Sequence, residues 1–386
     1  MEFEQKDSYK VDVMQIVAIF MSIKVVLSFS SICRPSGIVD NALTVLSICI
    51  CCIVVINKIY SLRTLFLSFL LGLVALYTCV KIGSYEILIS VMTILALKGY
   101  DFDKFLKMIY KTEVALLIIH VVYSMAYSLF INYDEFIIEG DRRWRFTFGF
   151  VHPNSFSAIL FGVILIYVWF HFETNMKDTL IKSSLIEVIA FALSDSRTAL
   201  MSYLVLVLLI FMKMDGRLNA IIRMITRWCV PLLSVIMFIL IRGYKNGWVI
   251  SILVNRFLTG RIRLGSYALE KSGLTLFGQA ISYMSTSVVW DEIWQLNSFT
   301  FDNMYSYCMM SAGLIWLVIL SIMAIVISKK LNLKCCIAFV VWAVYGLSEV
   351  IILNGYISFP IFLITLVLNS SVSNQLLYIE EGRREI

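Results

Sequence analysis

Long apolar runs bounded by charged residues recur along almost the whole of this 386-residue chain. A run of about 20 apolar residues is long enough for a helix to cross the hydrocarbon core of a bilayer. Only 15% of the residues are charged, whereas a soluble domain needs roughly a quarter to cover its surface. The runs therefore exclude a soluble globular enzyme and predict an all-α, polytopic membrane bundle.

About twelve of these runs are predicted to be transmembrane helices, because each is apolar and ends at charged residues. Their approximate limits are 11–32, 42–56, 64–80, 85–97, 114–131, 156–170, 179–193, 199–212, 228–241, 305–328, 335–353 and 357–368. Three charges fall inside spans, at Lys24, Glu187 and Glu349, and are candidates either for an ion pathway or for buried pairs. We expect a single membrane domain over residues 1–386.

The positions of Lys and Arg predict which side of the membrane each loop occupies, since cytoplasmic loops carry the excess of positive charge. Nineteen of the 32 Lys and Arg residues lie on the inner side if the N-terminus is cytoplasmic, which also makes 370–386 a cytoplasmic tail. The net charge of +6 then reflects membrane orientation, and no nucleic-acid partner is expected. Residues 242–304 form a large extracytoplasmic loop, expected to be partly helical around 262–272, because a simple connector would be shorter.

Most of the outward positive charges are arginines in three places: the loop 132–155, the turn 194–198 and the loop 242–304. Their guanidinium groups can bind phosphate oxygens in pairs, which favours a polyanionic ligand such as a pyrophosphate. The candidates are Arg145, Arg197, Arg261 and Arg263. The alternative is that these side chains pair with neighbouring acids and with lipid headgroups.

Two polar sequences open predicted spans on the outer side. His152 and Asn154 stand at one helix start, where Asn154 is expected to cap the first turn. Asp302 stands at the other, either as a helix cap or as a carboxylate that accepts a proton. The pair Asp101 and Asp103 forms a DxD sequence, which we interpret as charge balance in a Lys-rich connector, and no metal site is expected.

Four segments in order resemble the O-antigen polymerase and ligase superfamily of bacterial envelope polysaccharide enzymes, most closely its Wzy-type repeat-unit polymerases. They are RFTFGFVHPNSFSA at 145–158, SDSRTALMSYLVLVLL at 194–209, LTGRIRLGSYALEKSGLTLFGQA at 258–280 and FTFDNMYSYCMMSAGLIWLVIL at 299–320. Ligases of this superfamily often have His in the last segment. Asp302, Asn303 and Tyr305 stand there in this chain, which favours a polymerase.

The resemblance implies a fold similar to the C-type glycosyltransferases in a bacterial cytoplasmic membrane, with the active site beneath the outer loop. It implies transfer of a growing chain from undecaprenyl pyrophosphate to the next lipid-linked oligosaccharide repeat unit, with no cofactor. The four arginines would then hold the pyrophosphate. Asp302 is the expected base and His152 the second choice, and Asn154, Asn303 and Tyr305 are expected to bind substrate.

Membrane lipid, a flippase and a chain-length regulator are the partners that this function implies. Two alternatives remain open. One is an O-antigen-type ligase, which shares all four segments. The other is a transporter of lipid-linked oligosaccharides, although transporters tend to have two related halves and charges at the membrane midplane, whereas the polar residues here gather in outer loops.

Overall fold

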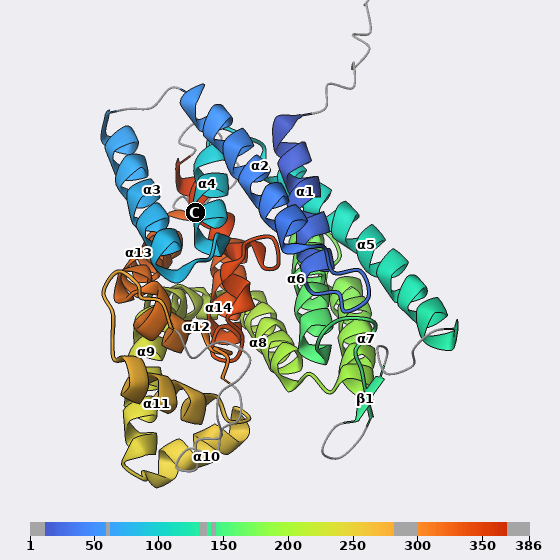
Figure 1. Ribbon diagram of the computed structural model, residues 1–386. Coiled ribbons are helices and arrows are strands. Elements are labelled where there is room, and N and C mark those ends of the chain that lie inside the picture. Colours follow the sequence, from blue (N-terminus) through green and yellow to red (C-terminus); the bar gives the residue numbers. More distant parts are fainter. Residues whose placement is uncertain (1–11, 59–61, 131–136, 140–143, 282–298, 369–386) are drawn as a thin grey trace, which may run out of the picture.

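The computed structural model describes residues 12–58, 62–130, 137–139, 144–281 and 299–368, which are mostly helical (Figure 1). The longer helices are α1 (Val13–Ser28), α2 (Gly37–Ile56), α3 (Leu62–Ile82), α4 (Glu86–Ala96), α5 (Phe102–Phe130), α6 (Pro153–His171), α7 (Met176–Ser194), α8 (Arg197–Met214), α9 (Asn219–Lys245), α11 (Arg261–Ser272), α13 (Leu314–Lys330) and α14 (Leu333–Tyr345). The shorter elements are β1 (Ile137–Glu139), β2 (Trp144–Phe146), η2 (Gly216–Leu218), α10 (Val249–Phe257), α12 (Met304–Tyr307), the π-helical turn η4 (Cys308–Ala312), η5 (Ile351–Leu353), η6 (Phe359–Leu363) and α15 (Ile364–Leu368). The described chain is thus an all-α protein with one small antiparallel hairpin, β1–β2.

Six helical stretches are long and apolar enough to cross a membrane. They are Gly37–Ile56, Thr64–Ile82, Phe102–Phe130, Pro153–His171, Arg197–Met214 and Gly216–Lys245. In an apolar stretch of 18 residues on each of α2 and α3, only 17% is buried inside the protein, whereas in the corresponding stretch of α6 the buried share is 72%. Apolar side chains exposed to this extent are stable in hydrocarbon rather than in water, so the protein is embedded in a membrane.

The count of twelve spans is not confirmed. Residues 86–96 form a helix of 11 residues, roughly half of the ~20 that cross a bilayer. The predicted span 335–353 stops as an α-helix at Tyr345, and the span 305–328 is interrupted at Gly313 after the π-helical turn η4. The predicted tail 370–386 lies outside the described residues.

Helix α14 forms the centre of the bundle. Every residue from Cys335 to Ala343 is buried, because α14 packs against α8, α9 and η6. A helix that is apolar on all sides belongs in a protein interior. With 13 residues it is only about 20 Å long, so residues 346–350, which follow it, lie inside the bundle and not beyond it.

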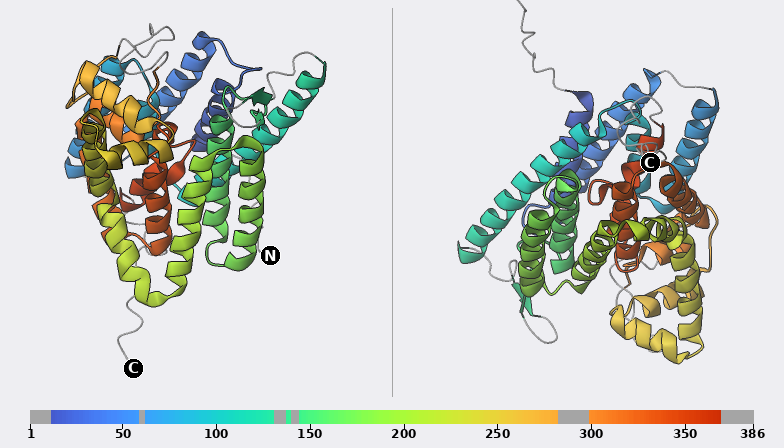
Figure 2. Two further views of the ribbon diagram at one scale, coloured as in Figure 1. Left: turned by 90° about the horizontal axis from the view of Figure 1, so that it is seen from below. Right: turned by 180° about the vertical axis from the view of Figure 1, so that it is seen from behind.

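One end of the bundle carries helices α10 and α11 and the β1–β2 hairpin, and we call it the α11 end (Figures 1 and 2). The helix predicted around 262–272 is confirmed as α11. The chain after α11 is fastened to the break between α12 and α13. Thr275 N–H donates to Met309 O at 3.0 Å, and Leu314 N–H donates to Thr275 O at 2.9 Å. These bonds satisfy backbone groups that the break exposes and so fix the start of α13.

Candidate functional site

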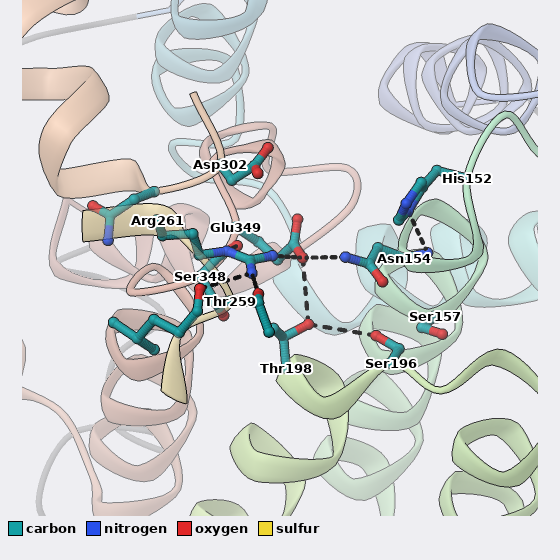
Figure 3. A network of polar contacts seen from close by, with 12 residues as sticks. His152, Asn154, Ser157, Ser196, Thr198, Thr259, Arg261, Asp302, Ser348 and Glu349 are labelled. Atoms are coloured by element: carbon teal, nitrogen blue, oxygen red, sulfur yellow. Dashed lines mark hydrogen bonds and ion pairs between the residues drawn. The ribbon is translucent and has the colours of Figure 1, made fainter. Parts of the chain in front are cut away.

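Polar side chains from five distant segments meet near the α11 end (Figure 3). The segments are the start of α6, the α7–α8 turn, the start of α11, residues 299–303 before α12, and residues 346–350 after α14. The first four contain the motifs that the sequence singled out. The fifth contributes Glu349, which lies at the centre of the network.

Glu349 accepts three hydrogen bonds on one carboxylate oxygen. Asn154 Nδ2, Thr198 Oγ1 and Arg261 Nη2 each lie 3.3 Å from its Oε1 atom. The side chain is only 9% exposed, and burying a carboxylate is costly unless it is paired and hydrogen-bonded. The guanidinium of Arg261, itself 6% exposed, supplies the opposite charge.

Arg261 is the first residue of α11, and most of its N–H groups are bonded within the protein, so a ligand would have to displace one of these contacts. Its Nε–H donates to Ser348 O at 2.6 Å, and its Nη1 group donates to Leu258 O at 3.2 Å and to the hydroxyl of Thr259. Together with the bond to Glu349, these contacts use four of the five N–H groups of a guanidinium. The main role of Arg261 in this geometry is therefore to hold Glu349 and the loop that carries it.

Arg145, on strand β2, extends the network on the side of α6. Its Nε–H donates to Ser194 O at 2.9 Å, and its Nη2 donates to Asn154 Oδ1 at 3.1 Å. The amide of Asn154 thus bridges Arg145 and Glu349, accepting from the cation and donating to the anion. Two of the four predicted arginines, Arg145 and Arg261, are joined in this way.

The other two arginines lie outside these contacts. Arg197, the first residue of α8, is 57% exposed, and its Nε lies 3.8 Å from Asp195 Oδ1. Arg263 is half-buried on α11, and its Nε has no hydrogen-bond partner among the described residues. Both side chains therefore keep donor capacity for a ligand.

The caps of two helices differ from the sequence prediction. His152 and not Asn154 caps α6, because its Nδ1 accepts from Asn154 N–H at 3.1 Å. Asn303 and not Asp302 caps α12, since its Oδ1 accepts from Ser306 N–H at 2.9 Å. Asn154, which does not cap α6, bonds Glu349. Half-buried Asp302 lies beside the network and accepts a local bond from Thr300 Oγ1 at 3.2 Å.

His152 and Asp302 lie on the same side of the row formed by Arg261, Glu349 and Asn154 (Figure 3). Burial of the ring and the positive charge of Arg145 lower the pKa of His152, although Asp302 opposes this. The ring is therefore neutral at pH 7. Because Nδ1 accepts the capping bond, the proton of the neutral ring is on Nε2, so His152 is suited to donate a hydrogen bond.

Asn303 and Tyr305, which the sequence predicts to bind substrate, each bond to a backbone carbonyl. Both are buried, and the Tyr305 hydroxyl donates to Ala343 O at 2.7 Å while Asn303 Nδ2 donates to Leu347 O at 2.5 Å. Carbonyl groups at a helix C-terminus lack partners within the helix. The two side chains satisfy such carbonyls at the end of α14 and so support the loop of Glu349.

Backbone strain is concentrated in the same segments. The described non-glycine residues with positive φ are Phe148 and Asp195, both at 54°, and Thr259 at 50°. Asp195 and Thr259 lie in site segments, and Phe148 lies between β2 and the start of α6. Such residues cost about 1–3 kcal/mol apiece. Strain of this kind persists where the surrounding structure holds it, which is common at functional sites.

Lys24 and the two aspartates of the DxD sequence have structural partners, whereas Glu187 is buried on α7. The Lys24 ammonium lies 3.7 Å from Asp40 Oδ2 and 3.5 Å from Glu86 Oε1, so this buried charge is paired with two partly exposed carboxylates. Asp101 accepts from Lys104 N–H at 3.0 Å, and Asp103 accepts from Trp169 Nε1 at 2.8 Å. The DxD sequence is thus used within helix packing.

Sequence reasoning did not assign Glu349 or Thr198 to the site. Glu349 was visible only as one charge within the apolar run 335–353, and Thr198 as a hydroxyl next to Arg197. The chain matches no protein-family model, no curated protein and no solved structure. The geometry is therefore the basis on which a function can be argued.

Proposed function

We propose that this protein is a membrane glycosyltransferase that polymerises undecaprenyl-pyrophosphate-linked oligosaccharide repeat units and releases undecaprenyl pyrophosphate. One observation carries the proposal: the four segments of the superfamily resemblance, spread over residues 145–320, meet in one polar network at one end of the bundle. Segments that meet in this way are expected if they act on a common substrate.

The proposal includes a topology. About twelve spans cross a bacterial cytoplasmic membrane, in an arrangement like that of the C-type glycosyltransferases, with both termini in the cytoplasm. The α11 end, to which loop 242–304 contributes α10 and α11, then faces outward. Lipid-linked repeat units delivered by a flippase would be present on that side. A chain-length regulator is a second expected partner, and the product is a capsular polysaccharide, an exopolysaccharide or an O-antigen.

The chemistry follows from the positions of the side chains. A hydroxyl of one repeat unit attacks the anomeric carbon of the growing chain, and the bond from that carbon to the pyrophosphate oxygen breaks. Asp302 takes the hydroxyl proton, while Arg145, Arg197 and Arg263 stabilise the charge that develops on the pyrophosphate. The Nε2–H group of His152 is suited to hold a sugar or phosphate oxygen, and Arg261 contributes positive charge while holding Glu349.

The test is a reconstitution of the purified protein in vesicles with one defined lipid-linked repeat unit as the sole substrate. A ladder of lipid-linked polymers is the expected result. Translocation of the substrate without bond formation would instead identify a transporter. Reaction only after addition of a second acceptor would identify a ligase.

A further inference from the structure

Glu349 is held by donors that would equally suit an anionic ligand. Its Oε1 atom is approached by a guanidinium, an amide and a hydroxyl, from Arg261, Asn154 and Thr198, all at 3.3 Å. These donors come from the first turns of three different helices, α11, α6 and α8. The starts of α8 and α11 have no side-chain cap, so their partial positive charges add to the field around this oxygen.

The network contains the guanidinium groups of Arg145 and Arg261 and the carboxyl group of Glu349, which pairs with Arg261, and the carboxyl group of Asp302 lies beside it. A pyrophosphate that enters next to Glu349 meets a like charge in a partly buried setting, where Coulomb interactions are strong. Ligand and carboxylate therefore compete for the same donors.

We infer that Glu349 is an internal counter-anion that competes with the pyrophosphate leaving group for Arg261, Asn154 and Thr198. The identity of the anion rests on the proposed function. The competition lowers the affinity for pyrophosphate, and it speeds product release because the carboxylate takes back the donors as the product leaves. An arginine cluster without such a competitor would retain its product, and product release often limits turnover.

Glu349→Gln isolates the charge from the geometry. The amide oxygen of Gln can occupy the position of Oε1 and accept the same three bonds. The amide nitrogen replaces Oε2, which has no hydrogen-bond partner among the described residues. Glu113→Gln is a control for the same substitution away from the network, since Glu113 is a buried acid on α5, which packs against α1.

The experiment measures the affinity of the purified full-length protein in nanodiscs for inorganic pyrophosphate, at low and fixed salt. E349Q is expected to bind about tenfold more tightly than the wild type or better, because one repelling charge is removed. E113Q is expected to match the wild type. Thr198→Val keeps the side-chain shape but removes one shared donor, and it should bind pyrophosphate a few-fold more weakly.

E349Q binding no more tightly than the wild type would overturn the inference, as would T198V binding with wild-type affinity. The absence of pyrophosphate binding by all four proteins would overturn it as well. The polymerisation assay separates this result from the proposed function. If E349Q binds pyrophosphate more tightly but the protein makes no polymer, the competition by Glu349 stands and the proposed function is wrong. If the protein makes polymer but E349Q binds pyrophosphate no more tightly, the proposed function stands and the competition is wrong.

Discussion

Helices α8 and α11 begin in nearly the same way but have different environments. Each starts with an arginine, Arg197 or Arg261, shortly after a residue with positive φ, Asp195 or Thr259. Arg261 is 6% exposed and bonded to Glu349, whereas Arg197 is 57% exposed beside Asp195. A cation at a helix N-terminus opposes the helix dipole. In α11 the unfavourable charge is compensated by the carboxyl group of Glu349, a buried residue from a distant segment. In α8 it is compensated by the nearby carboxylate of Asp195 and by exposure of the arginine.

The two arginines therefore have different tasks. Arg261 maintains the site, because it holds the loop of Glu349 through Ser348 O and the carboxylate. Arg197 can move to a ligand at little structural cost, since an exposed ion pair contributes about 0–1 kcal/mol. The following variants test this division, beginning with the one that should have the largest effect.

Arg261→Met should lower the free energy of unfolding by about 3–5 kcal/mol, because it leaves the buried carboxylate of Glu349 without its counter-charge. Thermal or denaturant unfolding in detergent micelles measures the loss. The matched control is Arg197→Met, at the equivalent position of α8. Equal losses in the two variants would contradict the comparison.

Thr259→Asn should raise the free energy of unfolding by about 1 kcal/mol, because Asn tolerates positive φ far better than a β-branched residue does. The Asn side chain also retains an oxygen that can accept from Arg261. Asp195→Asn, at the corresponding place before α8, should change stability by less than about 0.5 kcal/mol, since Asp already tolerates this conformation. Comparable gains in both variants would show that strain does not distinguish the two turns.

Arg197→Ala should change stability by no more than about 0.5 kcal/mol, as is usual for exposed ion pairs. If Arg197 meets the pyrophosphate, the KM for the lipid-linked repeat unit should rise while the protein remains folded. Steady-state kinetics in nanodiscs measure the effect. A wild-type KM and kcat would remove Arg197 from the site.

A smaller effect is expected on the pH dependence of stability, through His152. The pKa of His152 is lowered in the folded protein by burial and by Arg145, so the unfolded chain binds the proton more readily. Stability should therefore fall as the pH drops below about 6.5, the ordinary pKa of histidine. His152→Asn keeps a capping oxygen and should lose this dependence. Parallel melting curves of the two proteins between pH 7 and pH 5 would refute the assignment.

The sequence predicted the membrane class, the helix at 262–272 and the segments that meet in the site, because each depends on local composition. It did not predict the short α14 or the central place of Glu349. Whether a charge in an apolar run lies in a pair, as Lys24 does, or in a polar network depends on which helices surround it. The capping role predicted for Asn154 was wrong for a related reason, since the neighbouring His152 was an equally good cap. Of the two roles open for Asp302, the cap is taken by its neighbour Asn303.

The most direct test of the account is the double variant Arg261→Met with Glu349→Met. Replacing both members of a buried ion pair with apolar residues of similar volume often leaves stability unchanged or improves it. If the pair serves the reaction, the double variant should melt at or above the wild-type temperature yet leave single lipid-linked repeat units unjoined in the reconstituted assay. A stable double variant that produces a normal polymer ladder would contradict the central claim that this network is the functional site.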